Sequence, residues 1–244
     1  MSLREREDAY GQLILAYFRE GHAIEVVERD DGFLDASDYN PAAYFAPYRR
    51  WPAAERKAIR SARGRVLDIG CGAGRVALHL QERSHDVVAI DLSPLAVDVS
   101  RKRGVHDVRE LSITQIGPKL GEFETVVMFG NNFGLFGSPN RARWLLRRLR
   151  SVTNDRARVL AESRDPYTGS TPAHLAYHER NRRRGRMPGA LRIRIRHQLY
   201  ATPWFDYLIV SPDEMEHIVE GTGWRLAEVI DEGEVVYVGV LEPT

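Results

Sequence analysis

A glycine-rich turn behind a short apolar run constrains the fold of this 244-residue chain more than any other feature. The run covers residues 66–69, and glycines follow at positions 70, 72 and 74. Glycines at alternate positions after a strand allow a tight turn into a helix and let a ligand approach the backbone closely. The sequence therefore predicts a strand, a ligand-binding turn and a helix over residues 75–83.

Short apolar runs continue to alternate with helical segments after this turn. Because strands of this length separated by helices are typical of βαβ units, they indicate a mostly parallel sheet with helices on both faces. Further strands are expected at residues 87–90, 105–111, 125–129, 157–162, 224–230 and 235–241. Helices are expected after Ser93-Pro94, over residues 139–152 with Trp144 on the inner face, and from Ser211. The fold class is therefore α/β.

Two acidic residues mark the carboxyl ends of the first two strands. Asp68 precedes the first glycine, and Asp91 ends the next strand, 19 residues after Gly72. An acid in the second position can accept hydrogen bonds from both hydroxyls of a ribose. A dinucleotide-binding loop would have a third glycine where Arg75 stands, and Asp68 suits a cationic ligand better than a pyrophosphate. The pattern favours a nucleoside that carries an amino acid, although a strand-to-helix turn without a ligand could also need these glycines.

This pattern, Asp-x-Gly-Cys-Gly-x-Gly followed by an acid after the next strand, resembles the class I S-adenosylmethionine-dependent methyltransferases. The resemblance covers about residues 64–163 and, more loosely, residues 224–241. It implies a Rossmann-like, doubly wound, seven-stranded, mostly parallel sheet whose last strand is antiparallel. It also implies S-adenosyl-L-methionine as the cofactor and direct displacement of its methyl group. Because the sulfonium is already activated, the resemblance names no catalytic residue.

The resemblance also implies where the cofactor lies. The glycine turn would run beneath its methionine and ribose, Asp91 would bind the ribose, and Leu92 would pack on the adenine. Ser112 and Ile113 fall at the adenine edge, where this chain lacks the acid that the family often has. We expect the cofactor-binding residues to be Asp68, Gly70, Cys71, Gly72, Asp91, Leu92, Ser112, Ile113, Phe129, Gly130, Asn131 and Tyr44.

The segment after the fourth strand should contact both the cofactor and the acceptor, because the ligand crevice of such folds lies at the carboxyl ends of the strands. Members of the family that methylate amino groups of nucleic acids or glutamine carry Asn or Asp, two prolines and an aromatic residue here. This chain has Asn131-Asn132-Phe133, which argues against the base-flipping class. The two asparagines could instead only cap the turn. The predicted acceptor-binding residues are Asn132, Phe133, Arg164 and Tyr177.

Two segments outside this core are predicted to cover the site. Residues 1–60 are expected to form an N-terminal helical lid, with a helix over residues 5–20 and an aromatic loop at 28–52. Tyr10 and Tyr17 are assigned to the core of that lid. Residues 61–244 would form the methyltransferase domain, including an acceptor-side insertion at 165–210 before the last helix, and the whole would be one compact unit. Residues 190–210 are expected to contain an antiparallel pair.

The formal net charge of +1 conceals a segregation of charge along the chain. Residues 141–200 carry 16 arginines against four carboxylates, whereas residues 201–244 carry ten carboxylates against Arg225 alone. The arginines of residues 180–196 could pair with the acidic C-terminal segment, hold a small anionic acceptor, or bind the phosphates of RNA. We therefore predict a small-molecule acceptor, with an RNA or protein methyltransferase that uses residues 180–196 as the alternative. A third hypothesis is a module that holds the cofactor without chemistry.

The remaining features exclude several classes of site. Cys71 is the only cysteine, which excludes an intrachain disulfide and argues against a cysteine-based zinc site. His174 and His178 are four residues apart, but no third ligand is indicated, so no metal is predicted. No apolar run approaches the length of a membrane span and no secretory signal is recognised, so we expect a cytoplasmic protein with no membrane partner. The oligomeric state is left open.

Overall fold

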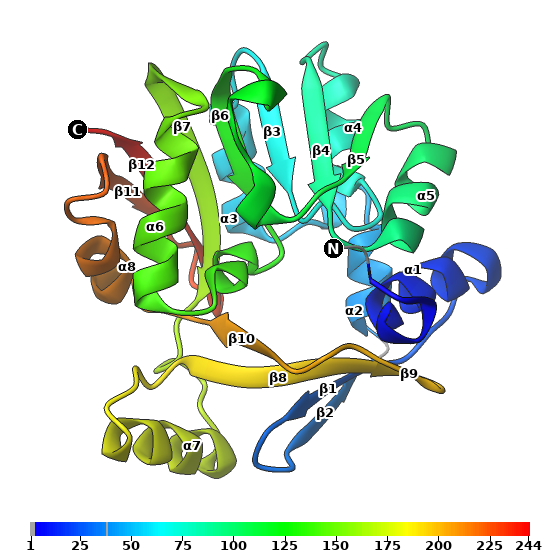
Figure 1. The fold of residues 1–244 in the computed structure, drawn as a ribbon, viewed down its shortest axis with the longest axis vertical. Helices are drawn as coiled ribbons and strands as arrows, with labels where there is room; N and C mark the ends of the chain where they lie inside the picture. The colour runs from blue at the N-terminus through cyan, green and yellow to red at the C-terminus, as the bar shows by residue number, and fades with distance from the viewer. Residues whose placement is uncertain (1–2, 38) are drawn as a thin grey trace.

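The computed structural model describes residues 3–37 and 39–244, and a seven-stranded sheet lies at its centre (Figure 1). The strand order is β11-β12-β7-β6-β3-β4-β5. The four neighbouring pairs from β7 to β5 are parallel, and β12 runs antiparallel to both β7 and β11. These strands are β3 (Val66–Ile69), β4 (Val87–Asp91), β5 (Asp107–Glu110), β6 (Phe123–Met128), β7 (Thr153–Arg164), β11 (Trp224–Ile230) and β12 (Val236–Pro243). The predicted doubly wound, mostly parallel sheet is confirmed.

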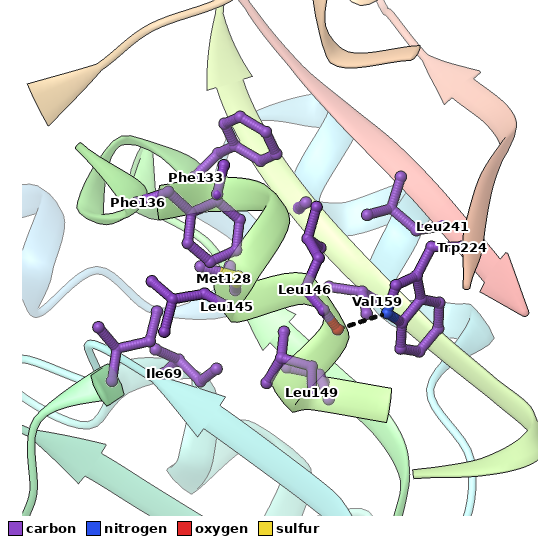
Figure 2. Close-up of a cluster of buried hydrophobic side chains, with 14 of the residues drawn as sticks. Ile69, Met128, Phe133, Phe136, Leu145, Leu146, Leu149, Val159, Trp224 and Leu241 are labelled. Atoms are coloured by element: carbon purple, nitrogen blue, oxygen red, sulfur yellow. Dashed lines mark hydrogen bonds between the residues drawn. The ribbon is translucent and has the colours of Figure 1, made fainter. Parts of the chain in front are cut away.

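Helices cover both faces of this sheet because side chains alternate along each buried strand. Leu67 packs into the cluster that includes the inner face of α6, and Val66 packs into the cluster on the other face, with α3 and α4. Figure 2 shows the first cluster, in which Trp224 Nε1 donates to the carbonyl of Leu146 at 2.9 Å. The helices are α3 (Ala53–Ala58), α4 (Arg75–Gln81), α5 (Pro94–Lys102), α6 (Pro139–Arg150) and α8 (Pro212–Val219). The prediction for Trp144 is wrong: it is 44% exposed, because other α6 residues fill the inner face.

The N-terminal segment and the 165–210 insertion together form a second sheet. Its strand order is β10-β8-β1-β2, with β9 also paired to β8, and all of its pairs are antiparallel. Its elements and neighbours are α1 (Ala9–Glu20), β1 (Glu25–Arg29), β2 (Leu34–Ser37), α2 (Tyr39–Tyr44), α7 (Pro172–Arg183), β8 (Ala190–His197), β9 (Tyr200–Ala201) and β10 (Phe205–Leu208). The antiparallel pair expected within residues 190–210 is confirmed. The expected loop at 28–52 is wrong, because the turn at Asp31-Gly32 joins two strands into a hairpin.

The second sheet lies across the edge of the main sheet where the parallel strands end (Figure 1). The hydroxyl of Tyr207 on β10 donates to the carbonyl of Asn131, just after β6, at 2.5 Å. Helix α1 packs against α5 beside the same edge. The N-terminal segment and the 165–210 insertion thus lie together across this edge, and the division of the chain at residue 60 stays a prediction. Short 3₁₀ helices lie at Glu5–Glu7, Tyr48–Arg50, Ile59–Ser61, Ile113–Gln115, Pro118–Leu120 and Asn132–Phe136.

Candidate active site

A pocket lies at the carboxyl ends of β3 and β6, beneath α1 and α2. Its floor is the glycine turn after β3, and its wall is the segment after β6. Tyr10 of α1 and Tyr44 of α2 complete the lining from the N-terminal segment. The lining residues are Tyr10, Tyr44, Asp68, Gly70, Cys71, Gly72, Ala73, Arg75, Val76, Phe129, Gly130 and Asn132.

The glycine turn is held by the left-handed angles of its own backbone and by hydrogen bonds to side chains, among them Asn132. Gly70, Gly72 and Gly74 have φ angles of +72°, +53° and +78°, in the left-handed region that favours glycine. The side-chain amide of Asn132 donates to the carbonyls of Ile69 at 2.8 Å and of Gly70 at 3.0 Å. A Cβ at position 72 would lie 2.7 Å from the hydroxyl of Tyr10. A side chain at position 72 would therefore collide with Tyr10. Without side chains at Gly70 and Gly72, only their backbone atoms line the floor of the pocket.

Asp91 supports this turn from the neighbouring strand. Its Oδ2 accepts a hydrogen bond from the amide of Gly72 at 2.9 Å, and its Oδ1 accepts one from the amide of Ser93 at 2.9 Å. The carboxylate is 9% exposed, and this burial raises its pKa to about 6. Asp91 thus joins the floor of the pocket to the start of α5, although it does not line the pocket itself.

Asp68 presents a buried carboxylate oxygen to the pocket. The residue is 2% exposed, and its Oδ2 has no hydrogen-bond partner among the residues that the structure describes. Burial raises the pKa of Asp68 to about 7, against the opposing effect of the Arg75 charge. A buried oxygen without a partner is costly unless a ligand supplies one. This position fits a cationic or proton-donating group of a ligand.

Replacing Asp68 with asparagine is expected to change how the stability of the ligand-free protein depends on pH. The raised pKa means that the folded state holds this proton more tightly than the unfolded chain, whose pKa is near 3.8. The stability that protonated Asp68 contributes is therefore complete below about pH 4 and is lost as the pH rises to about 7. Because asparagine stays neutral, Asp68→Asn should match the wild type near pH 4 and melt at a higher temperature near pH 8.

Thermal unfolding of both proteins across this pH range checks that prediction. The exposed Asp86, replaced by asparagine, is the matched control and should show the same difference from wild type at each pH, since its side chain is 69% exposed. An Asp68→Asn difference that does not grow between about pH 4 and pH 8 would show that folding does not raise the pKa of Asp68.

A second buried acidic group lies behind the pocket wall. Glu162, at the end of β7, accepts hydrogen bonds from the amides of Gly130 and Asn131 at 3.0 Å each. Burial, and then the neighbouring carboxyl of Glu55, raise the pKa of Glu162 well above its ordinary value. Arg75 forms a bidentate ion pair with Glu55, with one contact of 2.6 Å, and its guanidinium lies over the ring of Trp51. Sequence reasoning missed all three groups, although Glu162 ends a predicted strand.

Three of the predicted acceptor-site residues lie away from the lining of this pocket. Phe133 is fully buried and packs edge-on against Phe136 in the core, because left-handed residues at Gly130 and Asn131 turn the chain back under the sheet. Tyr177 is 2% exposed and donates to Asp30 at 2.7 Å, so it joins α7 to the hairpin. Arg164 ends β7 with an exposed side chain outside the pocket lining. Of the four predicted acceptor-binding residues, Asn132 lines the pocket.

The predicted adenine-side residues lie on the same edge of the sheet but outside this pocket. Leu92 follows β4 and is 40% exposed. Ser112 caps the 3₁₀ helix after β5, and Ile113 packs into the core. Asn131 turns with φ +63° and offers its carbonyl to Tyr207. Their roles toward the cofactor stay predictions. Tyr10 packs against the small core cluster of Ile14, Ala73 and Val99 and also lines the pocket.

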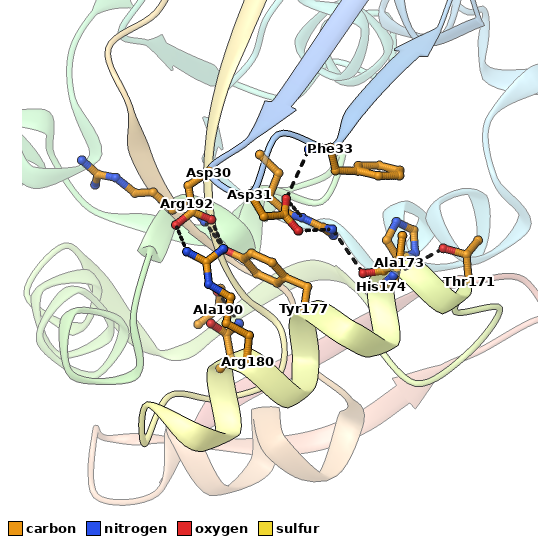
Figure 3. A network of polar contacts seen from close by, with 12 residues as sticks. Asp30, Asp31, Phe33, Thr171, Ala173, His174, Tyr177, Arg180, Ala190 and Arg192 are labelled. Carbon is orange, nitrogen blue, oxygen red and sulfur yellow. Dashed lines mark hydrogen bonds and ion pairs between the residues drawn. The ribbon is translucent and has the colours of Figure 1, made fainter.

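Six of the eight arginines of residues 180–196 pair with carboxylates of this chain, away from the pocket lining. Figure 3 shows Arg180 and Tyr177 of α7 meeting Asp30 of the hairpin. Arg194 and Arg196 both pair with Glu28. Further ion pairs link Arg182 to Glu179 and both Arg186 and Arg192 to Asp206. The expected internal pairing is therefore present, but the N-terminal hairpin supplies much of it.

Comparison with known proteins identifies the domain and its fold. A family model described as a methyltransferase domain matches residues 66–155. The structure of an S-adenosylmethionine-dependent methyltransferase from Bacteroides fragilis, in complex with S-adenosyl-L-homocysteine, matches with a TM-score of 0.84 and 25% identity. That match covers 100% of this chain and 98% of the other. The chain thus contains a methyltransferase domain and has the fold of an S-adenosylmethionine-dependent methyltransferase.

Curated relatives match the methyltransferase over shorter stretches. The magnesium-protoporphyrin O-methyltransferase of Rhodobacter capsulatus is 39% identical over 67 residues, which is 26% of this chain and 30% of that protein. A human lysine N-methyltransferase that is named for a subunit of ATP synthase is 30% identical over 123 residues, which is 49% of this chain and 50% of that protein. The chain thus spans between about a third and a half of the length of these relatives. Their names assign methylation of oxygen and of nitrogen respectively, so they leave the acceptor of this methyltransferase undecided.

The pocket of the methyltransferase fits the cofactor of the family. S-adenosylmethionine carries a positive sulfur and an ammonium group, and the pocket offers the unpartnered oxygen of Asp68 beside bare glycine backbone. Among the described residues, no group of three or more histidines, cysteines and acids could hold a metal ion. Within the same residues, no helix of the methyltransferase is long and apolar enough to cross a membrane.

Proposed function

We propose that this protein transfers the methyl group of S-adenosylmethionine to a small-molecule acceptor by direct displacement. One observation carries the proposal: Tyr10 and Tyr44 line the pocket on the glycine turn, and a second sheet, built from the N-terminal segment and the 165–210 insertion, lies across the same edge of the main sheet (Figure 1). A covered pocket suits a small acceptor that must be enclosed and kept from water. A polymer would need an open face.

The residues of the chain have separate roles in this proposal. Asp68 binds the ammonium end of the cofactor, Asp91 holds the ribose and the glycine turn, and the backbone of Gly70–Gly72 approaches the cofactor closely. When bound, S-adenosylmethionine supplies a methyl group on a positively charged sulfur, which needs no further activation. Catalysis then depends on holding the acceptor in line with that methyl group, and residues 1–60 and 165–210 act as the cover that does so.

The internal ion pairs argue against the RNA or protein acceptor that residues 180–196 suggested. Arg180, Arg194 and Arg196 are engaged by carboxylates of the hairpin, and Arg192 is engaged by Asp206. These carboxylates offset positive charge that residues 180–196 would otherwise present to the phosphates of RNA.

Radiolabelled methyl transfer tests the proposal and the acceptor class together. The purified protein is incubated with methyl-labelled S-adenosylmethionine and a cell extract, and the products are separated by size. We expect the label in the small-molecule fraction and none in RNA or protein. Label in a nuclease-sensitive or protease-sensitive polymer would overturn the small-molecule acceptor and keep the methyltransferase. The variant Asp91→Ala is the negative control for transfer by this site.

A further inference from the structure

The second sheet has two chemically different faces. Residues directly opposite in an antiparallel pair share a face, and neighbours along a strand alternate. Glu28 stands opposite Arg194 and pairs with it at 2.8 Å and with Arg196 at 3.1 Å, so these charges share one face. Glu25 is three residues before Glu28, and the register places it and Tyr207 on the other face. The arginines therefore lie on the opposite face of the sheet from Glu25.

Glu25 is joined to the pocket through Tyr44. Glu25 is 3% exposed and accepts hydrogen bonds from the hydroxyl of Tyr44, at 3.0 Å to Oε1 and 3.2 Å to Oε2. Tyr44 lines the pocket, and the ring of Tyr10 meets it edge-on at a centroid distance of 5.4 Å. Burial first, and the charge of Glu25 among the further causes, raise the pKa of Tyr10, Tyr44 and Tyr207. Tyr207 is tied to the same pocket by its hydroxyl, which donates to Asn131, and Asn131 stands between the lining residues Gly130 and Asn132.

The hydroxyls of Tyr44 and Tyr207 can offer only lone pairs to a bound molecule. A phenol has one proton to donate, and its oxygen also accepts. Tyr44 gives its proton to Glu25, and Tyr207 gives its proton to the carbonyl of Asn131 at 2.5 Å. Both side chains stay partly exposed. A molecule that meets them must therefore supply hydrogens, and the adjoining aromatic faces attract positive charge.

Arg75, the arginine among the described lining residues, is already ion-paired within the protein. Arg75 is bound on both terminal nitrogens by Glu55, and its side chain is 12% exposed. An anionic acceptor would meet no uncommitted cation among these described lining residues, but would meet the carboxylate of Glu25 behind Tyr44. The anionic acceptor expected from the arginine-rich segment therefore has no support in the pocket.

We propose that the acceptor is an amine, held by the hydroxyl oxygens of Tyr44 and Tyr207, with Glu25 supplying the balancing charge. The inference rests on the proposed methyltransferase function and names its substrate class. An ammonium offers hydrogens and positive charge, whereas an alcohol offers one hydrogen and a carboxylate offers none.

The same contacts account for the proton that N-methylation must release. The ammonium gives a proton to the oxygen of Tyr44 as the hydroxyl proton of Tyr44 passes to Glu25. The freed lone pair of the amine forms the new nitrogen–carbon bond while the carbon–sulfur bond of S-adenosylmethionine breaks and its electron pair stays on sulfur. The products are the methylated amine and S-adenosylhomocysteine, and Glu25 returns its proton to water through Tyr44.

Binding of matched probes to the protein loaded with S-adenosylhomocysteine tests this inference without turnover. The probes are 2-phenylethylamine, 2-phenylethanol and 3-phenylpropionate, which share a ring and a short chain, and calorimetry measures their affinities. We expect the amine to bind about tenfold or more tightly than the alcohol, because a charge-assisted hydrogen bond is stronger than a neutral one. The propionate should bind weakest. Equal affinities, a preference for either other probe, or no amine binding at millimolar concentration would overturn the inference.

Two variants, each with a matched control, test which residues recognise the amine. Glu25→Gln should lose the preference for the amine, whereas Glu28→Gln, on the arginine face of the same strand, should keep it. Tyr44→Phe should weaken amine binding several-fold. Tyr167→Phe should not, although Tyr167 also donates to a glutamate, Glu214, at 2.7 Å.

The affinity of each variant for S-adenosylhomocysteine separates the two proposals. A wild type that binds S-adenosylhomocysteine without preferring the amine removes the amine inference alone. A wild type that does not bind it removes the proposed function as well. Glu25→Gln that retains both S-adenosylhomocysteine and the amine preference removes Glu25 from recognition.

Discussion

Replacing Arg75 with alanine is expected to destabilise the ligand-free protein by about 3–5 kcal/mol, because it leaves a buried charge without its partner. Glu55 is 1% exposed and is bound on both oxygens by Arg75. Glu162, with its raised pKa, lies beside Glu55, so removal of the guanidinium leaves two neighbouring carboxyls in a dry site. For a chain of this length, the loss corresponds to a fall of roughly 6–20 °C in Tm.

Two further variants test whether the loss of stability arises because the ion pair is buried. Arg109 forms a bidentate pair with Asp107 of similar geometry, but its side chain is 40% exposed, so Arg109→Ala should cost no more than about 1 kcal/mol. Adding Glu55→Gln to Arg75→Ala should restore part of the lost stability, since the glutamine carries no charge. Thermal and urea unfolding measure all four proteins. If Arg75→Ala costs no more than Arg109→Ala, the buried pair is not ionic.

Local sequence patterns were enough to predict the main sheet. Strands β3 and β11 begin and end where the apolar runs predict, because each is bounded by polar or glycine residues. The glycine turn also predicts its own ligand-facing geometry, since only glycine adopts the left-handed angles at positions 70, 72 and 74 without strain. The family and its cofactor follow from that turn and from the position of Asp91.

The parts of the site that combine segments distant in the sequence could not be predicted from local patterns. The second sheet pairs β1 with β8, which are separated in the sequence by most strands of the main sheet, and no local pattern specifies such a partner. The Arg75, Glu55 and Glu162 group likewise joins three elements, so its members look like ordinary surface charges in the sequence. Tyr177 was predicted at the acceptor because its insertion was placed there, but its hydroxyl is taken by the hairpin.

S-adenosylhomocysteine at about 100 times its Kd is expected to raise the free energy of unfolding by about 2.7 kcal/mol, and Asp91→Ala should lose that gain. For a chain of this length, the wild-type gain corresponds to roughly 5–10 °C in Tm. The physical reason is that Asp91 both fixes the amide of Gly72 and offers the carboxylate proposed to bind the ribose. Differential scanning fluorimetry with and without the ligand measures the effect.

Stability and binding must be separated in this experiment, because Asp91→Ala also removes the acceptor of two backbone amides. The ligand-free Tm of the variant measures that structural loss, and the change in Tm on adding ligand measures binding alone. Asp91→Asn keeps the size of the side chain and one acceptor oxygen, so it should retain more of the fold while still weakening the ligand. Asp98→Ala, which breaks only an exposed pair with Lys102, should keep the full ligand effect. A wild type that shows no shift at millimolar S-adenosylhomocysteine would contradict the cofactor site, whereas a full shift in Asp91→Ala would contradict the role of Asp91 alone.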